Sequence, residues 1–267
     1  MKDESLDYGR EMNELLAEIH NKITRNSSNL SDRVEDQLTG NFFGSLRYLP
    51  FQDGLSKMLY TAQFSNEVVS SKWEEALSRL EAYELEYKFW FRHEKCEIDL
   101  LLSSSDILIG IEVKYISGLS SDDEIGTEVL DYRESRNQLL RYTVMLEQIA
   151  GNRPVYILFL APFEMMNAVR KTLLTRYPNV QLGFMNWQDL HQQLSLIGKE
   201  KLDIGHQLIV EDLKQLLEKK ELVRFRGFVS DISSQQVTSE SYQFSEEVIQ
   251  FNWPSIQIKG DYYEYKR

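Results

Sequence analysis

The chain has 267 residues, with 42 acidic and 30 basic side chains, and its formal net charge is −12. A hydrophobic content of 42% describes a folded globular protein and excludes a disordered one. A single cysteine, Cys96, excludes an intrachain disulfide framework and fits a reducing cytoplasm. The first 25 residues lack the apolar run of a signal peptide, and no stretch is apolar enough to span a membrane. We therefore expect a cytoplasmic protein without a membrane segment.

Helical periodicity predicts three helices in the first third of the chain. Apolar residues recur at helical spacing over roughly 5–25, which predicts an amphipathic helix outside the core. A second helix is expected from about Ser31 to a stop at Pro50. The sequence Ser71-Lys72-Trp73-Glu74 has the form of a capping box, which predicts the start of a third helix.

After the third helix the apolar period changes to two. Over 84–92, apolar and aromatic side chains alternate with polar ones, which predicts a strand. Two further strands are expected over 97–102 and 107–114, joined by the polar turn 103–106. The sequence thus predicts a three-stranded antiparallel meander.

The last two strands form a hairpin that separates charged from apolar side chains, because side chains alternate between the faces of a strand. Glu97 and Asp99 share one face with Glu112 and Lys114. The opposite face is expected to be wholly apolar, formed by Ile98, Leu100, Leu102, Ile107, Ile109, Ile111 and Val113. Three acids beside a lysine are costly to bury, and a divalent cation bound to oxygen ligands would compensate them.

The register of this hairpin depends on its turn. A turn centred on 104–105 would place Asp99 opposite Gly110 and Glu97 opposite Glu112. Because Gly110 has no side chain, this register would leave room for an ion beside Asp99. The alternative is a solvent-facing strand pair with an ordinary charge ladder, which explains poorly why a glycine interrupts that face.

Alternating helices and strands after the hairpin predict an α/β layer. The expected elements are, in order, a long helix over about 126–150, a buried strand from Pro154 to Leu160, a helix over 163–177, a short strand over 180–186, a helix from Trp187 to Ile197 and a helix over roughly 203–220. The stretch 229–241 is polar and linker-like, and 242–267 is aromatic and strand-prone.

Asp99, followed on the next strand by Glu112-Val113-Lys114, resembles the signature of the PD-(D/E)XK, or restriction-endonuclease-like, nuclease superfamily. The order helix, three-stranded antiparallel meander, helix, buried strand also resembles the core of that α/β fold, over about 31–190. The resemblance implies a nuclease domain over 31–228. A helical N-terminal addition (1–30) and a mixed C-terminal addition (229–267) lie outside it.

The same resemblance assigns roles to the hairpin residues. Asp99 and Glu112 would bind Mg²⁺ or Mn²⁺, with the Val113 carbonyl as a third oxygen ligand. Lys114 would orient the attacking water or offset the charge that develops on the phosphate. Glu97 shares the face of Asp99 and would bind through water or hold Lys114; the alternative is a salt bridge at the rim.

Residues on the flanking helices would complete the site. Many members of the superfamily carry an additional acid on the helix before the meander, and Glu35 lies there as a candidate metal ligand. Alternatively, Asp32 and Glu35 form an acidic pair that favours the start of that helix. Gln138 and Tyr142 resemble the Gln-x3-Tyr pattern of the RecB-like branch, in which the glutamine helps to organise the metal or the substrate; the alternative is a polar helix surface.

Three arginines, Arg133, Arg136 and Arg141, are expected on the same helix as Gln138, where they could contact phosphates. Equally, they could pair with nearby acids such as Glu128 and Glu134.

These observations together predict a metal-dependent nuclease that acts on DNA. The resemblance places such proteins in bacterial restriction or phage-defence complexes. The net charge of −12 opposes simple binding to a polyanion, so a protein partner or a homo-oligomer is also expected. Two alternatives stay open: a non-catalytic scaffold or interaction subunit that retains the fold, and a nuclease directed at RNA.

Overall fold

The computed structural model describes residues 30–80, 85–94, 96–119, 133, 135–177 and 180–224. These residues belong to one compact unit, which ends at Arg224. The helix predicted over 5–25, the linker over 229–241 and the aromatic segment over 242–267 lie outside the described residues. Within the described part of the chain, every helix is too short or too polar to cross a membrane.

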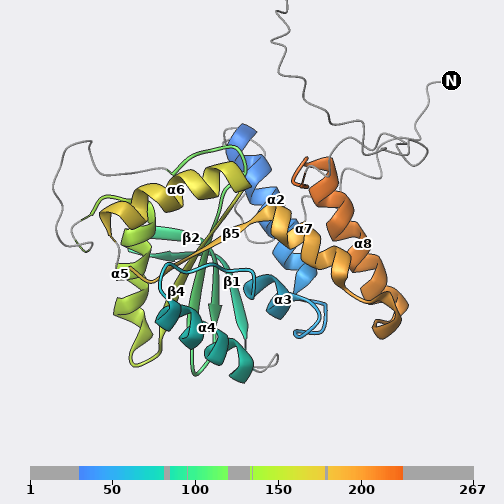
Figure 1. Cartoon of the computed structure of the whole chain (residues 1–267), viewed down its shortest axis with the longest axis horizontal. Coiled ribbons are helices and arrows are strands. Elements are labelled where there is room, and N and C mark those ends of the chain that lie inside the picture. Colours follow the sequence, from blue (N-terminus) through green and yellow to red (C-terminus); the bar gives the residue numbers. More distant parts are fainter. Residues whose placement is uncertain are drawn as a thin grey trace, which may run out of the picture. The chain divides into compact units, whose positions relative to one another are not determined.

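A five-stranded sheet with the order β1-β2-β3-β4-β5 forms the centre of this unit (Figure 1). The first three strands are antiparallel neighbours: β1 (Glu86–His93), β2 (Cys96–Ser103) and β3 (Leu108–Val113). The last two are parallel to β3: β4 (Val155–Ala161) and β5 (Leu182–Asn186). The predicted meander and the two later strands are therefore confirmed.

Helices cover both faces of the sheet (Figure 1). One face packs against α5 (Gln138–Ala150) and α6 (Phe163–Arg176). The other face packs against α2 (Leu30–Leu46), α3 (Leu55–Leu59), α4 (Glu67–Arg79), α7 (Trp187–Leu196) and α8 (Ile204–Lys219). A strand covered on both faces has no polar side, which is why β4 is apolar along its whole length.

Two predicted helix starts are wrong, because asparagines cap these helices elsewhere. The helix α4 begins at Glu67, where the Asn66 side chain accepts a hydrogen bond from the Val68 N–H at 2.8 Å. Ser71 therefore lies inside the helix. Likewise, α5 begins at Gln138, after the cap Asn137, and residues 135–137 are not helical. The single long helix expected from about 126 is thus wrong, and Arg133 and Arg136 do not belong to α5.

The hairpin of β2 and β3 has a different register from the predicted one. Leu101, rather than Asp99, lies opposite Gly110, because the turn is centred on 105–106, one position further along the chain than predicted. The Ser104 N–H donates to the Ile107 carbonyl at 3.0 Å and closes that turn. A shift of the pairing by two residues leaves each side chain on its predicted face, so the hairpin largely keeps the expected separation of a charged face from an apolar face.

Gly110 does not leave room for an ion. A side chain at this position would lie within about 3.0 Å of three apolar side chains, those of Ile98, Leu146 and Ile157. Glycine is required here because α5 and its neighbours approach the backbone of β3 closely. The predicted ion space beside Gly110 is therefore wrong.

The alternation of faces also inverts at one point of β1 and β2. Phe89 and Trp90 are consecutive, yet both are buried in the apolar cluster under α2. Trp90 has a φ of 47°, in the left-handed region, which reverses the side-chain direction beyond it. Phe91 and its cross-strand partner Ile98 consequently pack in the cluster under α5, so Ile98 does not lie on the predicted apolar face.

Candidate active site

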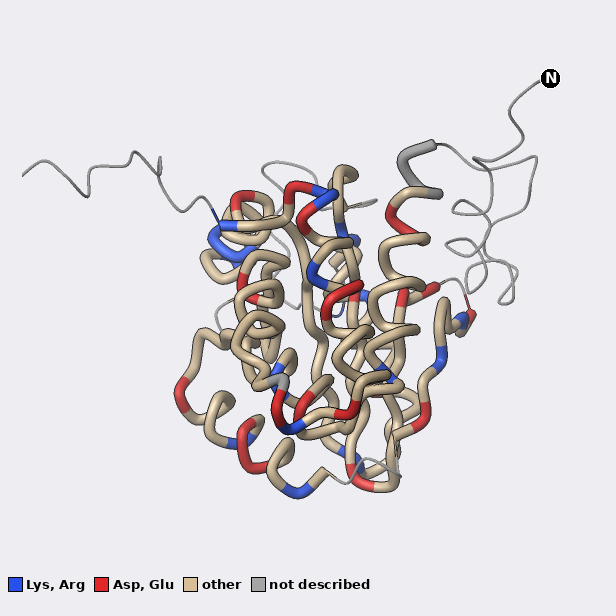
Figure 2. Tube along the Cα trace, turned by 90° about the vertical axis from the view of Figure 1, so that its right-hand side faces the viewer, with Lys and Arg blue, Asp and Glu red and all other residues tan. Residues whose placement is uncertain are grey.

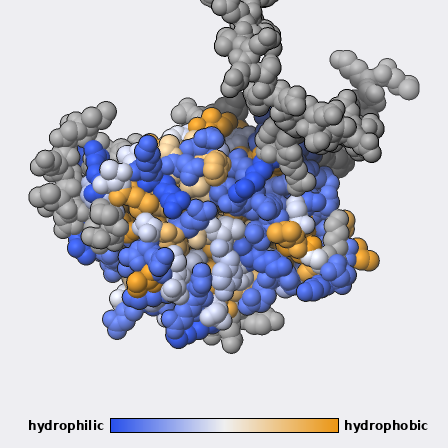
Figure 3. Space-filling view, in the orientation of Figure 1, coloured by the Kyte–Doolittle hydropathy of each residue, from blue (hydrophilic) through white to orange (hydrophobic). Residues whose placement is uncertain are grey.

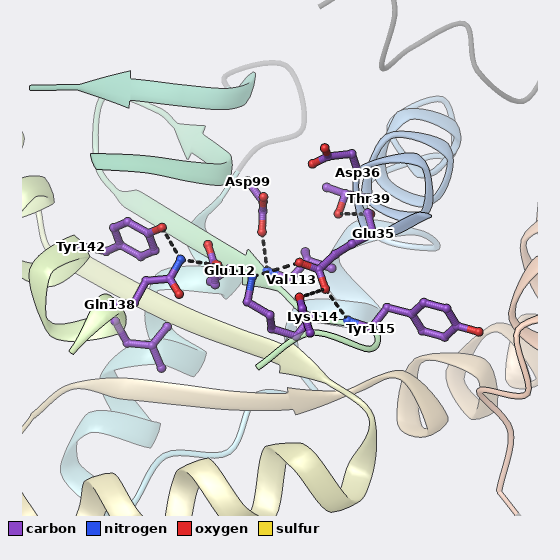
Figure 4. A network of polar contacts seen from close by, with 12 residues as sticks. Glu35, Asp36, Thr39, Asp99, Glu112, Val113, Lys114, Tyr115, Gln138 and Tyr142 are labelled. Carbon is purple, nitrogen blue, oxygen red and sulfur yellow. Dashed lines mark hydrogen bonds and ion pairs between the residues drawn. The ribbon is translucent and has the colours of Figure 1, made fainter. Parts of the chain in front are cut away.

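A network of charged and polar side chains gathers where β3 ends (Figure 4). Glu112 is near the end of β3, and Lys114 follows that strand directly. The neighbouring strand β2 contributes Asp99, while α2 contributes Glu35 and the first turn of α5 contributes Gln138. The structure therefore brings together the five residues that the sequence predicted as catalytic.

Lys114 is the centre of this network. Its Nζ lies 2.8 Å from Glu112 Oε1 and 3.0 Å from Glu35 Oε1, and the residue is only 7% exposed. Burial lowers the pKa of Lys114, but the carboxylates of Glu112, Asp99 and Glu35 raise it by more, so the pKa lies above its ordinary value. Lys114 is held as an ammonium.

Glu112 is almost completely buried, at 2% exposure. Burial and the nearby carboxylate of Asp99 raise the pKa of Glu112 well above its ordinary value, and Lys114 offsets this only in part. The amide Nε2 of Gln138 donates a hydrogen bond to Glu112 Oε1 at 2.8 Å. The site thus holds two carboxylates that disfavour each other's charge.

Asp99 replaces a main-chain bond of the sheet. Residue pairing between β2 and β3 ends at Leu100 and Ile111, and the next β3 amide to face β2, that of Val113, donates to Asp99 Oδ2 at 2.8 Å. The Asp99 side chain therefore fills the opening between the two strands, beside Glu112.

Both oxygens of Glu35 are engaged. Oε1 contacts Lys114, while Oε2 accepts hydrogen bonds from the Tyr115 N–H and the Ser117 hydroxyl, each at 2.8 Å. The acid predicted on this helix is thus inside the site, where it holds Lys114 and the turn that follows it.

Gln138 and Tyr142 face the strand from one turn of α5, as predicted. Besides its bond to Glu112, Gln138 Nε2 lies 2.7 Å from the Tyr142 hydroxyl. Burial and the charge of Glu112 raise the pKa of Tyr142. This tyrosine is therefore a neutral phenol that supports Gln138 from behind.

The oxygen ligands at this point fit a hard divalent cation. Asp99 and Glu112 supply carboxylates from adjacent strands, and the Val113 carbonyl lies in the chain between Glu112 and Lys114. A buried carboxylate, that of Glu112, beside the half-buried carboxylate of Asp99 is an environment that a cation stabilises. Within the described residues, no group of three or more His, Cys, Asp or Glu side chains forms a complete metal cage.

The predicted substrate-binding arginines divide into two environments. Arg141 and Arg133 line a cleft of about 770 Å³ between α5 and the β1–β2 turn. The guanidinium of Arg141 lies 3.4 Å from the Cys96 sulfur, and Arg133 pairs with Glu147 at 3.6 Å. Arg136 is exposed just before α5. Glu97 forms an ion pair with Arg92 of the neighbouring strand β1, as the alternative of a rim salt bridge expected.

Two indole groups that sequence reasoning did not identify also hold the site. Trp187, the first residue of α7, donates from Nε1 to the Lys114 carbonyl at 2.9 Å. Trp90 donates to the Asp36 carboxylate at 3.1 Å, beside Glu35. Of the two, only Trp187 could have been identified from the sequence, because it directly follows a predicted parallel strand and ligand sites form at the carboxyl ends of such strands.

Fold and site together define a mixed α/β protein with a buried acid–lysine cluster at the end of a central strand. No protein-family model matches the chain, and no curated protein matches it significantly.

Proposed function

We propose that this protein is a nuclease that hydrolyses phosphodiester bonds with Mg²⁺ or Mn²⁺, and that its substrate is DNA. One observation carries the proposal: Asp99, Glu112 and Lys114 converge at the end of β3, where Gln138 donates a hydrogen bond to Glu112. This is the arrangement implied by the resemblance to the PD-(D/E)XK superfamily.

The residues divide the chemistry among them. Asp99, Glu112 and the Val113 carbonyl would hold the cation, which polarises the scissile phosphate and acidifies a bound water. Lys114 carries a fixed positive charge that stabilises the anionic transition state. Gln138 orients the Glu112 carboxylate by donating to Oε1.

Glu35 acts as a positioning residue in this proposal. Its three hydrogen-bond donors fix the ammonium of Lys114 and the backbone of Tyr115 at once. A ligand role for Glu35 would require it to release one of these donors, so we assign it to holding Lys114 rather than the cation.

The substrate would approach along the cleft that Arg133 and Arg141 line, and Arg136, which is exposed just before α5, would be a further phosphate contact. Guanidinium groups bind phosphate oxygens and thereby fix the register of a nucleic acid without reading its bases. Because the chain as a whole is acidic, a protein partner or a second copy would supply further affinity. A nuclease subunit of a bacterial restriction or phage-defence complex fits these requirements.

A cleavage assay tests the proposal. The purified full chain is incubated with supercoiled plasmid or an RNA duplex, in Mg²⁺, Mn²⁺ or EDTA. We expect plasmid cleavage only with metal, and a loss of about 10²-fold or more in Glu112→Gln and Lys114→Met. Lys214→Met is the matched control and should cut normally, because Lys214 is a half-buried lysine on α8 that pairs with Glu211, outside the site.

Each other outcome has a defined meaning. Full cleavage in EDTA would exclude the metal mechanism. Cleavage of the RNA duplex but not of the plasmid would show that the substrate is RNA rather than DNA. No cleavage of either substrate, with Mn²⁺ binding also absent by calorimetry, would instead favour a non-catalytic scaffold.

A further inference from the structure

One line across the sheet departs from regular strand geometry. In β1, Trp90 is left-handed, with a φ of 47°. The register between β1 and β2 pairs Phe89 with Leu100 and Phe91 with Ile98, but it skips the pair Trp90–Asp99 between them. On the far side of β2, Asp99 takes the Val113 amide with its side chain. The three departures thus lie side by side on β1, β2 and β3, at Trp90, Asp99 and Val113, and the middle one is the proposed metal-binding carboxylate.

A buried hydrogen bond holds this irregularity in place. Trp90 Nε1 donates to Asp36 Oδ1 at 3.1 Å, and the two residues are only 7% and 8% exposed. A bulky residue with positive φ is rare, and such a conformation persists only where its surroundings fix it. The Asp36 carboxylate, one residue after Glu35 on α2, supplies such a fixed partner.

We propose that Trp90 and Asp36 are positioning residues for Asp99. The left-handed conformation of Trp90 inverts the alternation of side chains in β1 and, at the paired position, in β2. The Asp99 side chain is thereby free to enter the opening between β2 and β3. The bond to Asp36 ties this inversion to α2, whose neighbouring residue Glu35 positions Lys114. The two halves of the site, acid and lysine, are thereby set by one helix. This inference rests on the proposed function only for its effect on cleavage.

Three variants of the full chain test the inference. Trp90→Phe removes the indole donor, and Asp36→Leu removes the acceptor at similar volume. Asp36→Asn removes the charge but keeps an oxygen that can accept the bond, so it should behave like the wild type. Trp73→Phe is the matched control, because Trp73 is a buried tryptophan of α4, outside the site, whose Nε1 donates to the Leu59 carbonyl on α3.

The decisive readout is the hydrogen exchange of two adjacent amides. The Val113 amide donates to Asp99, whereas the Lys114 amide donates to the Leu160 carbonyl at 2.7 Å. In Trp90→Phe and Asp36→Leu we expect exchange at Val113 to rise on the order of tenfold relative to Lys114. In Trp73→Phe and Asp36→Asn the ratio should stay unchanged. This measurement needs no cleavage, so it decides the inference even if the protein is no nuclease.

Cleavage then measures the consequence. We expect kcat to fall by about tenfold to a hundredfold in Trp90→Phe and Asp36→Leu, with KM unchanged, because displaced Asp99 affects the chemistry rather than substrate binding. An unchanged ratio of Val113 to Lys114 exchange in these two variants would overturn the proposal. An equal change of that ratio in Trp73→Phe would overturn it as well, since the effect would then be general destabilisation.

Discussion

At the scale of single residues, the site is a balance of buried charges around Lys114. From the sequence, Lys114 and Glu112 point away from an apolar hairpin face; in the structure, both are also covered by α2 and α5 and are nearly inaccessible. Removing Lys114 would take the shared cation away from the Glu112 and Glu35 carboxylates, and an uncompensated buried charge destabilises proteins by about 3–5 kcal/mol. Lys114 therefore stabilises the fold as well as the proposed chemistry. Neutralising Glu112 differs, because Lys114 then keeps Glu35 as its partner.

Glu112 makes stability depend on pH in a defined direction. The pKa of Glu112 is raised in the folded chain, whereas in the unfolded chain it takes its ordinary value of 4.5. The folded chain therefore binds a proton at Glu112 more tightly than the unfolded chain does. The stabilisation is complete below pH 4.5 and is lost as the pH rises through the raised folded value. In Glu112→Gln this loss is absent. We expect the variant, in EDTA, to melt at a higher temperature than the wild type at pH 8, with the difference shrinking toward pH 4.5.

Thermal unfolding followed by circular dichroism checks this prediction. Glu75→Gln is the control, because Glu75 is exposed on α4 and pairs with Arg79 at the surface. It should follow the wild-type curve at every pH. Curves of the wild type and Glu112→Gln that stay parallel would show that Glu112 does not carry a raised pKa.

The residues of the site were predictable only where the pattern is local. Asp99, Glu112 and Lys114 lie within 16 positions of the sequence, and the alternation of side chains along the two predicted strands was enough to place them on one face. The Trp90–Asp36 and Trp187–Lys114 bonds join residues 54 and 73 positions apart. Only the packing of α2 and α7 on the sheet creates these contacts, and no periodicity encodes that packing.

At the scale of elements, periodicity identified the strands, but local backbone geometry decided details. The alternation over 84–92 predicted β1, yet the left-handed Trp90 inverted the second half of the strand. The capping box at Ser71 matched a sequence pattern, but Asn66 caps the helix five residues earlier. A cap depends on one side-chain oxygen that reaches one N–H, and several residues nearby can compete for that role.

The element α7 is tied to the site through its first residue. Trp187 is fully buried, packs edge-on against Phe42 with ring centroids 5.1 Å apart, and donates to the Lys114 carbonyl. Trp187→Phe would leave a small cavity and an unsatisfied carbonyl, at a cost of about 3 kcal/mol. Because Lys114 loses a main-chain anchor, we also expect kcat to fall by about tenfold.

Denaturant unfolding and cleavage kinetics measure these two effects of Trp187→Phe separately. Trp73→Phe again provides the comparison, since it removes a buried indole donor outside the site. It should destabilise the protein without lowering kcat. If both variants lose stability and kcat to the same extent, α7 supports the fold but does not position Lys114.

At the scale of the whole molecule, the described part of the chain shows no strong separation of charge. Lys and Arg alternate with Asp and Glu over its helices and turns (Figure 2). Apolar side chains on the face drawn in Figure 3 form small patches separated by polar ones. The expectation of a partner therefore rests on the net charge and on the sequence of 242–267, where ten large apolar or aromatic residues exceed what a solvated tail tolerates. The alternative is that this segment folds back as extra strands on the core of its own chain.

This expectation predicts self-association of the full chain. Light scattering should give a mass above the 31.4 kDa of one chain, and a variant that ends before residue 242 should return to the mass of a single, shorter chain. Truncation of 1–25 tests the predicted amphipathic helix in the same way. A monodisperse full-length monomer that cuts DNA without any other component would contradict the expectation.

The last prediction concerns the salt dependence of substrate binding by this acidic chain, whose net charge is −12. Only three arginines, Arg133, Arg136 and Arg141, are proposed to contact phosphates. Each phosphate contact on duplex DNA contributes about −0.9 to the slope of log K against log salt, so we expect a total slope of about −3. The inactive Glu112→Gln variant allows this slope to be measured with intact duplex by fluorescence anisotropy. In that background, Arg141→Ala should reduce the slope by about 1. Arg170→Ala, on α6 and hydrogen-bonded to Gln63, should leave it unchanged. A slope that Arg141→Ala does not alter would mean that the DNA backbone runs outside the cleft between α5 and the β1–β2 turn.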